Sequence, residues 1–172
     1  EFDRFSVGKE VSQAALKAYQ TIRYYNWVPI VMEETKLTLS VRLPDDEELV
    51  RAQEVVKSFA GRKPKNNTEV YAREAVLLKA MPPTRELKLQ AMRIGDLGIA
   101  AIPNEVFAAT GLDIKRKSPL KQTFTIELAN GCEGYIPPPD QHALGGYTTW
   151  RARTSCLEVN AEPKIQAKVL EL

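Results

Sequence analysis

The sequence predicts an α+β fold, in which a mostly antiparallel sheet carries helices packed on it. Three observations lead to this prediction: segments of strict apolar–polar alternation, segments with apolar residues at intervals of three and four, and a two-residue turn, Gly95-Asp96, between two alternating segments. A length of 172 residues fits one domain, or a substantial part of a larger one.

The first half of the chain predicts three helices and one strand. Residues 7–24 repeat apolar side chains on one helical face, and Pro29 prevents that helix from continuing. Residues 36–43 alternate strictly, which indicates a half-buried strand. Two further helices are expected at 45–59, behind a run of acidic residues, and at 68–81.

The second half predicts a hairpin followed by a helix and a strand. Residues 85–94 and 97–102 form the hairpin, and the second of these strands is apolar enough for a central position covered on both faces. A helix is expected at 105–116 with Asn104 as its N-cap, and a strand at 123–128.

The last part of the chain combines an irregular loop with a final helix. Residues 135–146 contain three consecutive prolines and two glycines, so neither a helix nor a strand is expected there. A long loop of this kind in a compact domain is usually functional. Glu162-Pro163 opens the final helix, with Pro163 at its first position.

Composition excludes several classes of protein. Hydrophobic residues make up 44% and charged residues 27%, which is typical of a soluble globular protein, and the net charge of +2 gives no reason to expect a nucleic-acid partner. No apolar run reaches the roughly 18 residues of a transmembrane segment. Cys132 and Cys156 make no disulfide framework, and the single histidine, His142, limits any metal site that this chain could build alone. Because the chain begins Glu1-Phe2-Asp3, we expect a piece of a longer protein.

Three side chains are candidates for a functional site, each with an ordinary structural alternative. Glu105 follows an apolar strand, where a carboxylate could bind a metal or act as a base, or could simply complement a helix dipole. Tyr135 follows a glycine-flanked turn and Tyr147 follows Gly145-Gly146, yet either ring could instead pack under the proline-rich loop. Cys132 has no adjacent histidine, which argues against a thiol nucleophile.

Residues from about 97 to 150 resemble the second half of the catalytic domain of the neutral/alkaline (non-lysosomal) ceramidase family. The segments that carry the resemblance are Ile102-Pro103-Asn104-Glu105-Val106-Phe107, Asn130-Gly131-Cys132-Glu133-Gly134-Tyr135-Ile136, Pro138-Pro139-Asp140-Gln141 and Gly146-Tyr147-Thr148. The resemblance implies that the chain belongs to a larger layered α/β catalytic domain. Two departures stand out: Asn104 replaces a glycine, and Cys132 replaces a tyrosine that is not a metal ligand.

The resemblance also implies a function, that of a zinc amidohydrolase of bacterial lipid and sphingolipid metabolism. Glu105 and Tyr135 match two metal ligands, Tyr147 matches a tyrosine that polarises the amide carbonyl, and two histidines would come from the missing N-terminal half. The substrate class would be a ceramide-like N-acyl lipid, cleaved to a fatty acid and an amino alcohol. Family members are commonly secreted or periplasmic, and they carry a C-terminal immunoglobulin-like domain that is not found here.

Zinc bound by Glu105 and Tyr135 alone should be weak, so we expect the isolated chain to be inactive and essentially metal-free. Two other hypotheses remain open. The chain could be a non-catalytic binding or scaffold domain that keeps the fold, or a small intact enzyme that uses Glu105 and His142.

Overall fold

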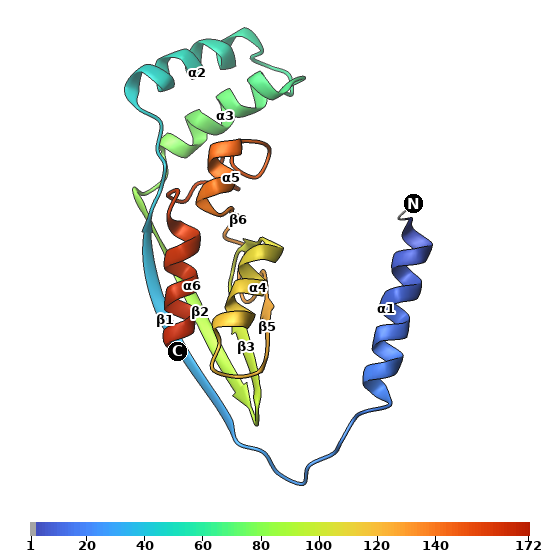
Figure 1. Cartoon of the computed structure of the whole chain (residues 1–172). Coiled ribbons are helices and arrows are strands. Elements are labelled where there is room, and N and C mark those ends of the chain that lie inside the picture. The colour runs from blue at the N-terminus through green and yellow to red at the C-terminus, as the bar shows by residue number, and fades with distance from the viewer. Residues whose placement is uncertain (1–2) are drawn as a thin grey trace.

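A four-stranded mixed sheet forms the centre of the molecule (Figure 1), whose computed structural model describes residues 3–172. Its strand order is β1 (Ile30–Ser40), β2 (Thr84–Ile94), β3 (Leu97–Ala101) and β5 (Gln122–Ile126). The first three strands are antiparallel neighbours, whereas β5 runs parallel to β3. The predicted α+β fold is therefore confirmed, with one parallel pair because a helix returns the chain between β3 and β5.

Two helices, α4 (Ala108–Lys117) and α6 (Ala161–Glu171), cover one face of this sheet (Figure 1). Four alternate strand residues on this face, Leu39, Leu87, Leu89 and Ala100, are almost fully buried. The largest apolar side chains of the core are Leu39, Leu78, Leu87, Leu89, Ile102, Ile114, Ile136 and Ile165.

The opposite face of the sheet is open in the described part of the chain. Met32, Met92, Ile99 and Phe124 lie side by side across the four strands, and Met32 and Phe124 are exposed. The central position of β3 is thus confirmed, but the expectation that helices cover it on both faces is wrong within residues 3–172.

A helical hairpin of α2 (Asp46–Ser58) and α3 (Asn67–Lys79) stands at one end of the sheet (Figure 1). The acidic start of α2 forms a capping box, because Asp45 accepts from the Glu48 amide and the Glu48 carboxylate accepts from the Asp45 amide. Both helices lie within two residues of the ranges predicted from periodicity.

Glu74 on α3 holds the C-terminal segment through Arg153. The Arg153 Nε and Nη2 atoms each donate to the Glu74 carboxylate at 2.9 Å, and Glu74 is buried. These hydrogen bonds hold the pKa of Glu74 below its ordinary value of 4.5. A depressed carboxyl pKa stabilises the fold above the unfolded value, and this contribution disappears as the pH falls through the lowered folded value.

Glu74→Gln is therefore expected to lower the free energy of unfolding by about 2 kcal/mol at neutral pH, and by less in acid, where the carboxyl is protonated. Denaturant unfolding at a series of pH values measures this. The control is Glu47→Gln, because the Glu47 side chain is 88% exposed and reaches Arg51 only at 3.5 Å. An equal loss in the two variants at neutral pH would contradict the role given to Glu74.

Helix α1 (Arg4–Tyr19) stands apart from the rest of the molecule (Figure 1). None of its residues is buried, and residues 20–29, which form neither a helix nor a strand, join it to the sheet. The helix ends earlier than predicted, and β1 begins at Ile30 rather than Lys36, because pairing with β2 continues as far as Ile94. None of the described helices is long and apolar enough to cross a membrane.

Three predicted elements need correction around the proline-rich region. Glu105-Val106 forms a short strand, β4, so the predicted helix starts only at Ala108, and its N-cap is Phe107 rather than Asn104. Residues 135–146 are not irregular, because they contain β6 (Tyr135–Ile136) and α5 (Pro139–Leu144). The final helix begins at Ala161, which places Pro163 third rather than first.

Candidate metal centre

The strands β4 and β6 pair in parallel and place Glu105 directly opposite Tyr135. The Glu105 amide donates to the Gly134 carbonyl oxygen at 3.0 Å, which fixes this register. Side chains of directly opposed residues project to the same side of a ladder, so the carboxylate and the phenol share one face. Two predicted site residues, thirty positions apart in the sequence, are therefore brought together at the end of β3.

Asn104 connects the two segments that carry these side chains. It is fully buried, and its Nδ2 donates to the carbonyl oxygens of Glu133 (3.1 Å) and Gly134 (3.2 Å). On the other side of Glu105, the Val106 amide donates to Glu127 Oε2 at 2.9 Å. Asn104 thus links two turns and does not cap a helix, which reasoning from local sequence alone missed.

Gly134 allows the close approach on which the position of Tyr135 depends. Its φ of +78° is a left-handed conformation, and a Cβ atom there would lie 2.4 Å from the Thr154 carbonyl oxygen. The same oxygen accepts from the Tyr135 amide at 2.8 Å. The glycine in the turn before Tyr135 is therefore required by the backbone that supports the site.

Tyr147 lies against Tyr135, so all three predicted site residues meet. The ring centroids are 5.6 Å apart and the rings are nearly perpendicular, an edge-to-face arrangement typical of aromatic pairs. Tyr147 remains 62% exposed, which leaves it accessible to a ligand. A second aromatic pair, Tyr71 and Trp150 at 5.3 Å, comes from α3 and the segment after Tyr147, and sequence reasoning did not identify it.

The Glu105 carboxylate controls the ionisation of Tyr135. Hydrogen bonding between the phenol and this carboxylate, together with burial and the proximity of Tyr147, raises the pKa of Tyr135 to about 12. The Tyr135 phenol is therefore neutral at neutral pH. A bound cation would reverse this balance, because it attracts the oxygens of both side chains in their ionised forms.

Glu105→Gln is expected to lower the pKa of Tyr135 from about 12 toward its ordinary value of 10.0, because the neighbouring negative charge is removed. NMR titration of the chain carrying ring-labelled tyrosine measures this, with Tyr135→Phe to assign the signal. In the control Glu133→Gln, which removes a carboxylate paired with Arg85, the pKa of Tyr135 should stay near 12. An unchanged pKa in Glu105→Gln would show that the two side chains do not interact.

His142 and the cysteines have different surroundings. His142 lies on α5, where burial and the nearby Arg42 guanidinium lower its pKa. Cys132 is exposed and Cys156 is buried, and both are free thiols. In residues 3–172 no cluster of three or more His, Cys, Asp or Glu side chains is arranged to hold a metal ion. Glu105 and Tyr135 supply oxygen donors on one face of the β4–β6 ladder, fewer than the four ligands of a zinc site.

Comparison with solved structures shows which known fold this chain resembles. The fold matches part of a neutral ceramidase structure, which confirms the resemblance at the level of the fold. The crystal structure of neutral ceramidase from Pseudomonas aeruginosa matches over 90% of this chain with a TM-score of 0.54 and 15% identity. A structure described as ceramidase complexed with C2 matches over 69% of the chain and 18% of its own, with a TM-score of 0.44 and 18% identity.

The chain spans only 30% of the length of the Pseudomonas structure. No protein-family model matches the sequence, and a search of curated proteins gave no match. At this level of identity the likeness shows the fold, and the assignment of chemistry depends on the site itself.

Proposed function

We propose that this chain is the C-terminal part of the catalytic domain of a zinc-dependent amidohydrolase, which cleaves an N-acyl, ceramide-like lipid to a fatty acid and an amino alcohol. The observation that carries the proposal is the register of β4 and β6, which sets Glu105 beside Tyr135, with Tyr147 packed against Tyr135. The likeness to ceramidase structures in fold supports it.

Glu105 and Tyr135 would be two of the four zinc ligands, and two histidines from another part of the protein would complete the set. A zinc ion held there would supply a Lewis acid and a bound water whose pKa is near 7. To hold the cation, Tyr135 would release its phenol proton, and the Glu105 carboxylate would bind the same cation. Because two oxygen ligands bind zinc weakly, the 172-residue chain by itself is expected to be metal-free and inactive.

Tyr147 would act on the substrate rather than on the metal. Its exposed phenol can donate a hydrogen bond to the amide carbonyl oxygen, where negative charge develops as the carbon becomes tetrahedral. Removal of one such donor typically costs about 3 kcal/mol, or roughly a hundredfold in kcat. Tyr135 holds the Tyr147 ring edge-to-face and thereby limits the directions in which the hydroxyl can point.

The experiment compares two variants in a longer protein that contains this chain. Glu105→Gln is expected to lower zinc content and abolish hydrolysis of an N-acyl amide, whereas Tyr147→Phe is expected to keep zinc and to lose roughly a hundredfold in kcat. Tyr19→Phe, on the exposed helix α1, is the matched control. Elemental analysis measures zinc, and release of fatty acid measures hydrolysis.

The results of these measurements distinguish a zinc-dependent hydrolase from a non-catalytic scaffold domain. Unchanged zinc content and unchanged hydrolysis in Glu105→Gln would remove Glu105 from the mechanism. A longer protein that neither binds zinc nor hydrolyses N-acyl amides would favour the scaffold. Stoichiometric zinc in the isolated chain would contradict the half-site.

A further inference from the structure

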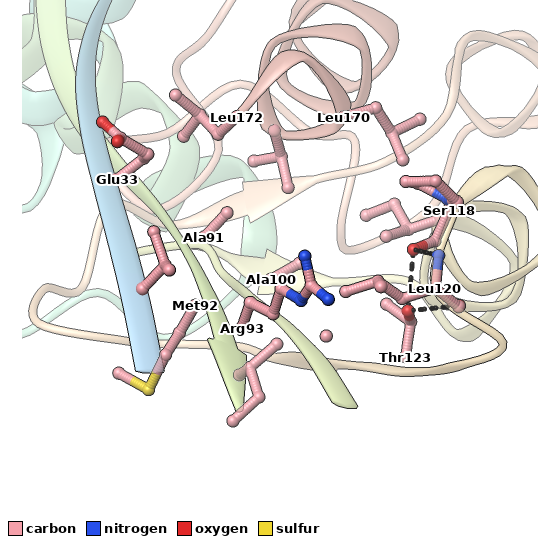
Figure 2. A pocket seen from close by; sticks show the side chains of 16 residues that line it. Glu33, Ala91, Met92, Arg93, Ala100, Ser118, Leu120, Thr123, Leu170 and Leu172 are labelled. Atoms are coloured by element: carbon pink, nitrogen blue, oxygen red, sulfur yellow. Dashed lines mark hydrogen bonds between the residues drawn. The ribbon is translucent and has the colours of Figure 1, made fainter. Parts of the chain in front are cut away.

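An apolar groove opens on the helix-covered side of the sheet, toward the turn that joins β2 and β3. It has a volume of about 360 Å³ and lies between the C-terminal ends of α4 and α6 and the strands beneath them (Figure 2). Most of its lining side chains are aliphatic, and they include Ala91, Ala100, Ile114, Leu120, Val169 and Leu170. A volume at the small end of the range for ligand sites suits one slender apolar molecule.

Gly98 lies at the base of the groove, where a side chain would crowd the neighbouring residues. A Cβ atom on Gly98 would lie 2.8 Å from Thr123 Oγ1 and 3.1 Å from Leu120 Cδ1. The two hydroxyl groups that line the groove already make hydrogen bonds within the protein (Figure 2). Thr123 Oγ1 lies 2.7 Å from Ser118 Oγ, and Ser118 Oγ accepts from the Leu120 amide at 3.1 Å. The wall therefore offers an apolar surface with its polar atoms satisfied internally.

Arg93 supplies the one positive charge among the lining residues. Figure 2 shows its guanidinium among the side chains that line the groove, with Glu33 farther away on β1. Arg93 Nε donates to the Gly95 carbonyl oxygen at 2.8 Å. No carboxylate within residues 3–172 lies at ion-pair distance from Arg93, so its remaining N–H groups can bind an anion.

We propose that this groove binds a single-chain lipid with an anionic head, namely an alkyl carboxylate. Its chain lies against Ala91, Ala100 and Leu170, and its carboxylate pairs with Arg93. The site is separate from the candidate metal centre, because Glu105, Tyr135 and Tyr147 are not among the residues that line the groove. Binding of this lipid needs no zinc, and it can be measured without amide hydrolysis.

A negatively charged side chain, Glu33, also lines the groove. It lies at the groove on the neighbouring strand, where its carboxylate opposes a second negative charge. Removing Arg93 and removing Glu33 should therefore change the affinity for an anion in opposite directions. An apolar occupant such as a helix of a second copy would respond to neither charge in this way.

The test measures binding of laurate to the 172-residue chain by calorimetry, below the concentration at which laurate forms micelles. Saturable one-to-one binding is expected, and laurate should bind roughly tenfold more tightly than the shorter decanoate, since each buried methylene contributes a few-fold. Dodecanol, which lacks the charge, should bind several-fold more weakly than laurate.

Four variants locate the site. Arg93→Gln is expected to weaken laurate binding about threefold to fivefold, and Glu33→Gln to strengthen it about twofold. Arg23→Gln removes an arginine from the exposed segment before β1 and should change nothing. Ala91→Leu fills the groove and should abolish binding, and its thermal unfolding is compared with that of the unchanged chain to confirm that it folds.

Several outcomes would overturn the proposal. These are the absence of laurate binding, equal binding of laurate and dodecanol, and binding that is unchanged in both Arg93→Gln and Ala91→Leu. A stable dimer that loses its association in Ala91→Leu would assign the groove to a second copy instead.

Discussion

Gly134→Ala is expected to lower the free energy of unfolding by about 3 kcal/mol or more. A residue with a side chain is strained at a φ of +78°, and the new Cβ atom would lie 2.4 Å from the Thr154 carbonyl oxygen, which is backbone and cannot rotate away. The variant must push Thr154 and Tyr135 apart. We therefore expect Tyr135 to lose the amide hydrogen bond that it now makes to Thr154 at 2.8 Å.

Denaturant unfolding measures the stability, and amide hydrogen exchange at Tyr135 measures the local contact. Gly61→Ala is the matched control, because Gly61 has a similar φ of +85° but a Cβ atom added there would have no neighbour within 4 Å. Its expected loss is about 1 kcal/mol, from backbone strain alone. An equal loss of stability in Gly134→Ala and Gly61→Ala would show that the contact with the Thr154 carbonyl oxygen does not destabilise the variant.

Arg42→Ala is expected to destabilise the protein by about 3 kcal/mol. The guanidinium donates to three carbonyl oxygens, those of Leu157 (2.7 Å), Thr149 (3.2 Å) and Ser155 (2.7 Å). Burial is the main reason that the pKa of Arg42 falls below its ordinary value. Truncation would remove the donor of the Leu157 and Thr149 oxygens and leave the Ser155 oxygen with only the long bond from the Ala152 amide at 3.5 Å. Each unsatisfied group costs free energy.

The loss should also affect the candidate site, because Arg42 follows β1 and fixes the segment between Tyr147 and the final helix. Arg42→Lys keeps the charge but has no planar fork to reach three acceptors, so it should recover less than half of the lost stability. Arg116→Ala is the control, since Arg116 is exposed and pairs with Asp113, three residues away on the same helix. Chemical denaturation compares the three variants, and full recovery in Arg42→Lys would show that charge alone matters.

Local sequence rules predicted the larger elements well. Alternation over β2 and β3, with Gly95-Asp96 between them, indicated a hairpin, and the register from Gln90 with Ala101 to Ile94 with Leu97 confirms it. The acidic residues before and in the first turn of α2 likewise indicated the start of a helix, which the structure confirms. These features depend on residues close in sequence, so that periodicity and turn chemistry suffice to predict them.

The same rules failed where a strand depends on a distant partner. β4 and β6 have two residues each, too few to show a period, and each exists because the other lies beside it. Asn104 stands where an N-cap would stand, but its amide donates across to Glu133 and Gly134. No pattern near Asn104 indicates this contact, because the two segments meet only in the folded chain.

The sequence by itself therefore determined the α+β class, the larger helices and strands, and the three side chains Glu105, Tyr135 and Tyr147 as candidates. Only the tertiary structure decided that these three side chains meet, that Gly134 must be a glycine, and that an apolar groove with an unpaired Arg93 opens between α4 and α6 within residues 3–172. The physical reason is that hydrophobic periodicity shows which face of a helix or strand is buried. A site combines side chains from several elements, and local sequence does not show which elements lie close together in the folded chain.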